Sequence, residues 1–122
     1  MAISREYVEL YCREISQAIE RHYVASGYRI SPGMIYPEYG RRFTRIVHDK
    51  GAQRFVHAFV DMTNGDVIKS AGWKAPQRGV NGLAVRFNLV DEESRERGFR
   101  AIDPYGSYLY EGVLDKKASA SV

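Results

Sequence analysis

The sequence has almost no cysteine. Cys12 is the only one among 122 residues, so no disulfide can form within the chain. The absence of a disulfide framework fits a reducing compartment, and we expect a cytoplasmic protein. No apolar run approaches the roughly 18 residues that cross a bilayer, and the first residues lack the basic start of a signal peptide. We therefore expect no contact with a membrane.

Motifs for metal binding and catalysis are also missing. The three histidines, His22, His48 and His57, show no ligand-like spacing with each other or with Cys12. Neither the Gly-x-Ser-x-Gly elbow nor a glycine-rich phosphate-binding motif occurs. The acidic cluster at 91–93 lies where a helix begins, and the helix dipole accounts for it. We expect no enzymatic activity, no metal and no cofactor.

Two of the histidines deserve a structural interpretation. His48 and His57 could face each other across a hairpin, and we interpret them as a hairpin pair or as buried, hydrogen-bonded side chains. Cys12 lies on the apolar side of a predicted helix, which is typical of an inert packing residue.

The residues that are present indicate one globular domain of the α+β class. A composition of 44% apolar and 27% charged residues is ordinary for such a domain, which we assign to residues 1–115. Residues 116–122 are small and polar, and we expect a disordered tail there.

The first predicted element is an amphipathic helix over residues 4–26. Apolar side chains recur at three- and four-residue spacing, Ser4 is suited to the N-cap, and Gly27 is suited to the C-terminal stop. Residues 28–40 are broken by prolines at positions 32 and 37 and could supply a short edge strand.

From residue 41 onward the apolar period changes to two, which predicts strands over 42–48, 53–61 and 66–71. Asn64-Gly65 is the pair favoured in type I′ hairpin turns. Residues 83–90 alternate again and are interpreted as a fourth strand or an extended segment. The prediction is therefore a three- to four-stranded antiparallel meander, with the strand over 53–61 covered on both faces.

The remaining segments are a loop, a short helix and a tyrosine-rich end. Residues 73–82 form the loop. Asp91 begins a second helix over about 92–101, in which Gly98 weakens the helix by about 1 kcal/mol relative to alanine. Residues 103–106 make a turn, and the segment after it carries Tyr108 and Tyr110.

Positive charge is concentrated in the middle of the chain. Residues 41–86 hold nine basic and three acidic side chains, although the whole chain has a net charge of only +3. Such asymmetry indicates either an anionic partner or a solvated face. The candidate anion-binding residues are Arg41, Arg42, Arg45, Lys74, Arg78 and Arg86.

Aromatic residues accompany these charges. Phe43 follows two arginines, and Trp73 precedes a Gly/Pro loop that carries Lys74 and Arg78. Cations that neutralise phosphates, beside rings that stack on bases, are typical of nucleic-acid binding. The alternative is that Phe43 and Trp73 belong to the core and that the charges are only solvated.

The tyrosine-rich segment suggests a surface for a partner. Candidate contact residues are Trp73, Tyr105, Tyr108 and Tyr110, because tyrosine and tryptophan are enriched at interfaces. The alternative is an aromatic plug that closes the core.

An ordered series of short motifs resembles a known group of proteins. The motifs are Phe55-Val-His-Ala-Phe-Val-Asp, Gly65-Asp-Val-Ile-Lys-Ser-Ala-Gly-Trp-Lys-Ala-Pro, Val85-Arg-Phe-Asn-Leu and Asp103-Pro-Tyr-Gly-Ser-Tyr-Leu-Tyr. The series resembles small bacteriophage-encoded proteins of unassigned function, including ones from actinobacterial phages, over residues 41–110. The resemblance implies an origin in the infected bacterial cytoplasm and assigns no catalytic residue.

Three functions fit these observations. The first is a phage accessory protein that binds nucleic acid through a basic sheet and loop face. The second is an interaction module directed at a host bacterial protein, with an exposed apolar patch near the tyrosine segment or the first helix. The third is a binder of a small phosphorylated molecule, with a pocket of Trp73, Arg78 and Arg86 and the loop 74–82 as its lid. A homodimer is also possible through the first helix or a strand edge.

Overall fold

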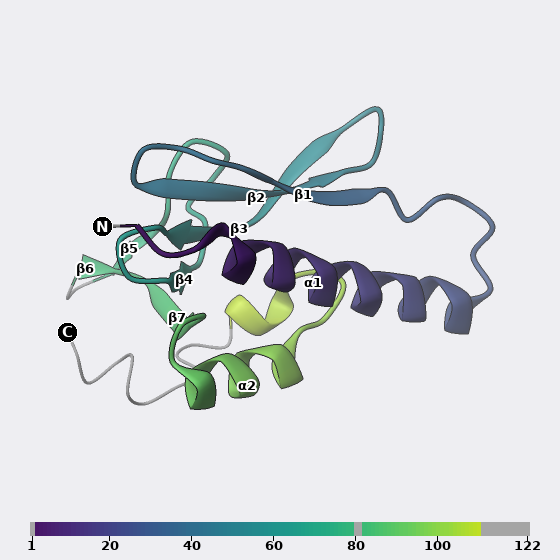
Figure 1. The fold of residues 1–122 in the computed structure, drawn as a ribbon. Coiled ribbons are helices and arrows are strands. Elements are labelled where there is room, and N and C mark those ends of the chain that lie inside the picture. Colours follow the sequence, from purple (N-terminus) through teal and green to yellow (C-terminus); the bar gives the residue numbers. More distant parts are fainter. Residues whose placement is uncertain (1, 80–81, 111–122) are drawn as a thin grey trace.

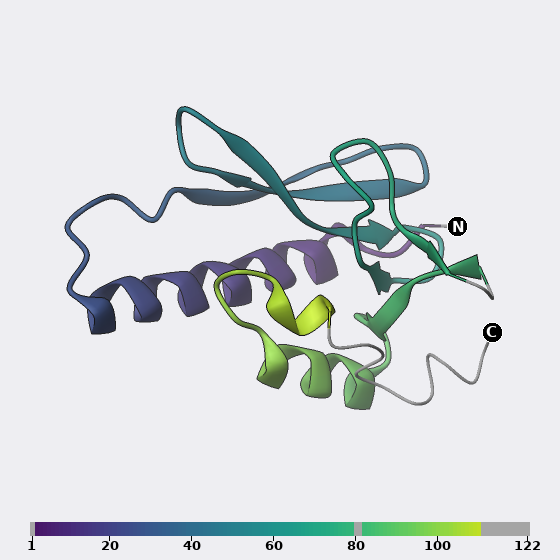
Figure 2. The ribbon, with the colours of Figure 1, turned by 180° about the vertical axis from the view of Figure 1, so that it is seen from behind.

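A computed structural model of the chain describes residues 2–79 and 82–110 and shows an α+β fold. Figure 1 shows an antiparallel sheet with both helices on one side of it, and the view from behind in Figure 2 shows the same layering. We call the face of the sheet toward the helices the inner face. The predicted fold class is confirmed. The predicted tail at 116–122 lies outside the described residues.

The first helix, α1, covers Arg5–Ser26, as its apolar spacing predicts. The Ser4 hydroxyl accepts a hydrogen bond from the Glu6 N–H at 3.2 Å and caps the N-terminus. Gly27 ends the helix in the left-handed region at φ 70°, and its N–H donates to the last carbonyls. Both signals are local, which is why the sequence locates both ends.

The sheet has five strands rather than three or four. They are β1 (Met34–Glu38), β2 (Phe43–Asp49), β3 (Arg54–Asp61), β4 (Asp66–Ile68) and β7 (Val85–Asn88). All neighbours are antiparallel, in the order β1-β2-β3-β4-β7. The meander is confirmed, residues 28–40 do supply an edge strand, and the segment at 83–90 is a strand at the other edge.

The loop between β4 and β7 is more regular than predicted. It contains a small hairpin of β5 (Arg78–Gly79) and β6 (Gly82–Leu83), and an isolated bridge joins Ser70 to Pro76. Backbone bonds such as Gln77 N–H to the Lys69 carbonyl, at 2.8 Å, fold the loop back on itself. The sequence did not predict this pairing, because the proline and glycines at 76, 79 and 82 are typical of an irregular loop.

The core lies between the inner face and the helices. Ile46, Ala58, Val60 and Val67 from the sheet pack with Ile15 of α1, among others, in this cluster. On the opposite, outer face, Val47, Phe59 and Ile68 are also almost fully buried. Residues 58–61 of β3 are therefore covered on both faces, as the apolar run predicts, whereas Arg54 and Phe55 at the start of the strand are exposed.

The second helix, α2 (Glu92–Ala101), follows its predicted bounds, with Asp91 accepting a bond from the Ser94 N–H at 3.0 Å. Gly98 has a packing role that the sequence does not reveal. A Cβ atom at this position would lie 2.2 Å from the Phe87 ring, so the helix can approach β7 only with glycine there. The chain then forms a 3-10 turn, η1 (Ser107–Leu109), whose Tyr108 and Leu109 are buried in the core.

Candidate functional site

A β-bulge places His57 on the inner side of the sheet. Ile46 of β2 pairs with Ala58, but the next residue, Val47, pairs with Val56, so His57 is an extra residue in β3. A bulge re-aims the side chain that it inserts and is often found beside functional sites. The uninterrupted period-two pattern predicted that His57 alternates with its neighbours in β3. Because of the bulge, it does not.

His48 reaches the same side from β2 and is held by the loop before β1. Its Nε2 lies 2.8 Å from the Pro32 carbonyl oxygen. Because a carbonyl only accepts, Nε2 carries the proton in this bond. The loop comes this close because Gly33 has φ 85°, and a Cβ atom there would lie 2.4 Å from the Asp49 carbonyl oxygen. His48 is therefore a hydrogen-bonded, buried histidine, as predicted.

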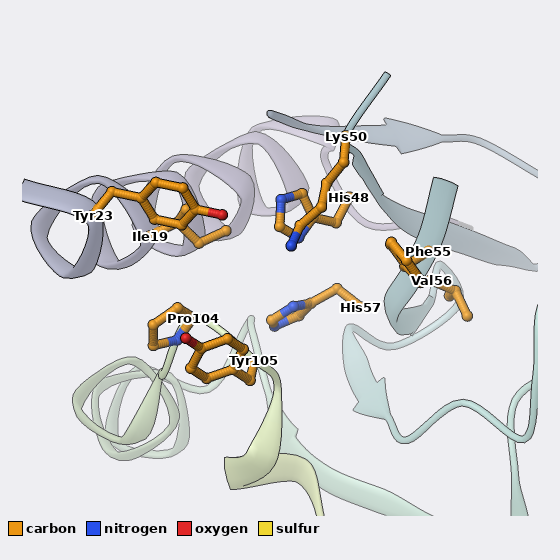
Figure 3. A pocket seen from close by; sticks show the side chains of 9 residues that line it. All are labelled: Ile19, Tyr23, His48, Lys50, Phe55, Val56, His57, Pro104 and Tyr105. Carbon is orange, nitrogen blue, oxygen red and sulfur yellow. The ribbon is translucent and has the colours of Figure 1, made fainter. Parts of the chain in front are cut away.

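The two histidines share a pocket of about 270 Å³ between three parts of the fold. One wall comes from the C-terminal half of α1, one from the end of the β2–β3 hairpin, and one from the turn before η1. The lining residues are Ile19, Tyr23, His48, Lys50, Phe55, Val56, His57, Pro104 and Tyr105. Figure 3 shows His48, Lys50 and His57 extending from the sheet toward the space bounded by Tyr23, Pro104 and Tyr105.

A chain of hydrogen bonds leads from the pocket into the core. His57 Nε2 lies 2.7 Å from the Tyr108 hydroxyl, which lies 2.6 Å from the Tyr11 hydroxyl. Burial lowers the pKa of His57 to about 4 and raises the pKa values of both tyrosines well above their ordinary range. All three groups are therefore neutral near pH 7.

The turn that forms the third wall is held by one carboxylate. Asp103 accepts hydrogen bonds from the backbone N–H groups of Tyr105, Ser107 and Tyr108, at 2.7 to 3.0 Å. Tyr105 also joins the turn to α1, because its hydroxyl lies 2.7 Å from His22 Nε2. These bonds fix the tyrosine ring beside the pocket.

The structure divides the predicted tyrosine surface into two parts. Tyr108 is buried and plugs the core, whereas Tyr105 and Tyr110 are 66% and 63% exposed. Of these two, only Tyr105 lines the pocket; the Tyr110 ring centroid lies 4.1 Å from Lys69 Nζ. The plug interpretation therefore applies to Tyr108, whereas a partner contact at Tyr105 and Tyr110 stays a prediction.

Three of the six predicted anion-binding residues have partners inside the protein. Arg42 forms an ion pair with buried Asp61 at 3.1 Å, and Arg45 forms one with Glu38 at 2.8 Å. The bonds from Arg45, and then from Arg54, lower the pKa of Glu38. Arg86 donates from Nε to the Leu109 carbonyl, and burial lowers its pKa. These side chains support the fold as well as carrying charge.

Trp73 is half-buried on the outer face. Its ring centroid lies 4.4 Å from the guanidinium carbon of Arg45 and 4.9 Å from that of Arg54. Arg86 instead contacts Leu109, and Arg78 is exposed on β5. The described contacts of Trp73 and Arg86 thus lie with different residues, and a common pocket of Trp73, Arg78 and Arg86 for a phosphorylated ligand stays a prediction.

The other three predicted residues are exposed. Arg41, Lys74 and Arg78 have no ion pair among the described residues. Lys74 lines a hollow of about 380 Å³ on the outer face, together with Gly40, Phe43 and Arg45. The turn that carries Arg41 therefore lies near the loop that carries Lys74.

The part of the chain that the structure describes has neither a candidate metal site nor a candidate membrane-spanning helix. No group of three or more histidine, cysteine or carboxylate side chains in these residues is placed to hold a metal ion. Neither described helix is long and apolar enough to span a bilayer.

The fold and the pocket define a small α+β domain with a concave site between a helix, a hairpin end and a turn. The chain belongs to a family of unknown function, DUF7717, whose model matches residues 2–111. No curated protein and no solved structure matches the chain. A phage origin stays a prediction that rests on the motif resemblance.

Sequence reasoning found only part of this site. It named Tyr105 as a contact residue and suggested that the two histidines face each other. It counted Lys50 only as a charge and gave no role to Tyr23 or Phe55. The one available signal was the hairpin register, which places His48 close to residues 55–57.

Proposed function

We propose that the protein is a non-catalytic module that binds a protein partner through this pocket and the aromatic side chains around it. The observation that carries the proposal is the exposure of those side chains. Tyr28, Phe55 and Tyr105, which we call the aromatic rim, are 53%, 46% and 66% exposed. Exposed tyrosines around a side-chain-sized hollow are typical of the centre of a protein interface.

The rim is continuous with the pocket. Phe55 and Tyr105 line the pocket itself, and the Tyr28 ring lies 5.1 Å from the ring of Tyr23, another lining residue. Val24 and Ile30, near the end of α1, are exposed as well. These exposed apolar side chains support the interaction hypothesis, which predicted an apolar patch near the tyrosine segment or the first helix.

The size of the pocket favours a side chain over a free ligand. Pockets for drug-sized molecules have about 300–1,000 Å³, and this one, at about 270 Å³, is smaller. Its chemistry favours binding over catalysis, because burial lowers the pKa of His57 to about 4 and so makes this ring a weak base. The phage resemblance favours a host bacterial protein in the cytoplasm as the partner.

Site-specific photo-crosslinking in cells tests the proposal. A photoreactive phenylalanine analogue at position 55 or 105 should capture a discrete partner, and the same analogue at position 110 should not. With that partner purified, Phe55→Ser and Tyr105→Ser should each weaken binding by about tenfold or more, as expected for interface anchors. The matched control is Tyr110→Ser, because Tyr110 is equally exposed but lies outside the rim. Equal losses at all three positions would contradict the proposal.

A second candidate function is nucleic-acid binding on the outer face. It is supported by Arg41, Lys74 and Arg78, which are exposed and not engaged in described ion pairs. Three phosphate contacts predict a slope of about −3 in log K against log salt on duplex DNA. A gel shift that is unchanged by alanine at all three positions would exclude this surface.

A further inference from the structure

The pocket has a polar wall and an apolar wall. Lys50, His48 and His57 extend from the sheet, whereas Ile19 and Pro104 lie across the space from them (Figure 3). Among the nine described lining residues, Lys50 has the one formal charge and there is no carboxylate. An anionic group that enters beside the ammonium group of Lys50 would therefore meet no negative charge among these lining residues.

The hydrogen-bond chain also gives the pocket a donor. The buried Tyr11 hydroxyl has the Tyr108 hydroxyl as its side-chain partner, so its proton is satisfied only if it donates to the Tyr108 oxygen. Tyr108 then donates to His57 Nε2, which leaves the proton of the neutral ring on Nδ1. The imidazole of His57 therefore offers an N–H donor while it carries no charge.

From this arrangement we infer that the pocket recognises a carboxylate attached to an apolar group, and specifically the C-terminal residue of the partner chain. The inference rests on the proposed function and names the chemistry of its ligand. A terminal residue carries a carboxylate and an apolar side chain on one carbon. The carboxylate faces Lys50 and His57, and the apolar side chain packs against Ile19 and Pro104.

An internal aspartate or glutamate fits less well. Its carboxylate ends a stem of only one or two methylene groups, so little would fill the apolar wall, and the partner backbone would have to pass the site on both sides. A chain end needs only one exit, across the aromatic rim. Capture of a terminal carboxylate is an established mode of peptide recognition.

The first experiment measures the carboxylate preference. The probes are N-acetyl-leucine and N-acetyl-phenylalanine, each compared with its neutral amide, and the readout is the NMR signals of the His48 and His57 rings. We expect the acids to bind about tenfold more tightly than the amides, as one charge-assisted contact supports. Lys50→Met, which keeps most of the apolar stem, should abolish this preference, and Lys74→Met on the outer face should preserve it.

The second experiment separates a chain end from a free acid. A hexapeptide with a C-terminal leucine and a free carboxylate should bind more tightly than N-acetyl-leucine, because it also contacts the rim, and its amidated form should bind weakly. Equal affinity of peptide and N-acetyl-leucine would assign the pocket to a small carboxylic acid and overturn the inference.

Acid and amide binding with equal affinity, or histidine signals that no probe shifts, would also overturn it. The proposed function would survive those results if crosslinking at positions 55 and 105 still captured a partner. Loss of that crosslinking would remove the proposed function itself, so the two failures are distinguishable.

Discussion

His57 connects the surface pocket to the interior through the Tyr108 hydroxyl and, beyond it, the Tyr11 hydroxyl. Its ring is inserted by the bulge in β3, lies beside Gly106 of the turn and is bonded to Tyr108. The ring packs with aromatic neighbours, since its centroid lies 6.4 Å from that of Tyr11 and 5.6 Å from that of Tyr108. The side chain is partly buried among these groups, which is why its charged form is disfavoured.

The lowered pKa of His57 predicts a loss of stability in mild acid. The unfolded chain takes up a proton below about pH 6.5, whereas the folded chain does so only near pH 4, so acidification favours unfolding within this window. Between about pH 7.5 and 4.5 we expect a loss of up to about 3 kcal/mol from this group. Urea unfolding measured at several pH values checks the slope.

The matched variants are His57→Gln and His22→Gln. His57→Gln should be less stable near neutral pH but should show a flatter dependence on pH. His22→Gln should keep the wild-type slope, because His22 bonds to Tyr105 at the surface and takes no part in the buried chain of His57, Tyr108 and Tyr11. A wild-type slope in His57→Gln would contradict the assignment.

The sequence predicted both histidines as hydrogen-bonded residues but did not predict the offset between them. Residues 55–60 are apolar or aromatic apart from His57, so a period-two pattern continues through the bulge without a visible break. The position of the extra residue is decided by packing against Tyr11 and Tyr108, which are distant in sequence. Local periodicity does not contain that information.

At the scale of the elements, the turn before η1 is held by a single carboxylate. Asp103 accepts three backbone hydrogen bonds, and the turn that it holds supplies Pro104 and Tyr105 to the pocket. The sequence predicted a turn here from Asp-Pro-Tyr-Gly, but it did not show that one carboxylate organises the next five residues. The ends of the helices could be predicted from the sequence, because each capping residue is close in sequence to the residues that it caps.

Replacing Asp103 should therefore release this wall of the pocket. We expect Asp103→Ala to cost about 2–3 kcal/mol of unfolding free energy, since hydrogen bonds to a charged acceptor are lost together. Asp91→Ala, which removes only the cap of α2, should cost about 1 kcal/mol. Chemical denaturation gives both values, and the NMR signal of His57 should shift in Asp103→Ala but not in Asp91→Ala. Equal costs with an unshifted signal would contradict this role.

At the scale of the whole molecule, the fold places its two candidate surfaces on different faces. The pocket opens on the inner side, beside α1, whereas Trp73 and Lys74 lie on the outer face. The sequence predicted a basic middle third correctly as composition. It could not predict that Arg42, Arg45 and Arg86 find partners within the fold, because those partners are set by strand pairing and by the return of the chain at Leu109.

Cys12 should report on the integrity of the whole fold. It is buried in the helix–sheet core, and burial raises the pKa of its thiol to about 12. Because the thiolate is the reactive form, we expect alkylation of the native protein to be slower than that of a free thiol by about a hundredfold or more at neutral pH. Stopped labelling over a urea gradient should follow the same transition as circular dichroism. Fast labelling without denaturant would show that α1 opens locally.

The contact of Trp73 with two guanidinium groups has a consequence for spectroscopy. The chain contains one tryptophan, so its intrinsic fluorescence at long excitation wavelengths comes from a single indole on the outer face. That emission is a reporter for the Arg45–Glu38–Arg54 cluster and for anions that approach it. A ligand seated between His57 and Tyr105 would leave it unchanged, so a titration that is silent in fluorescence and visible in the histidine signals would by itself locate the binding event.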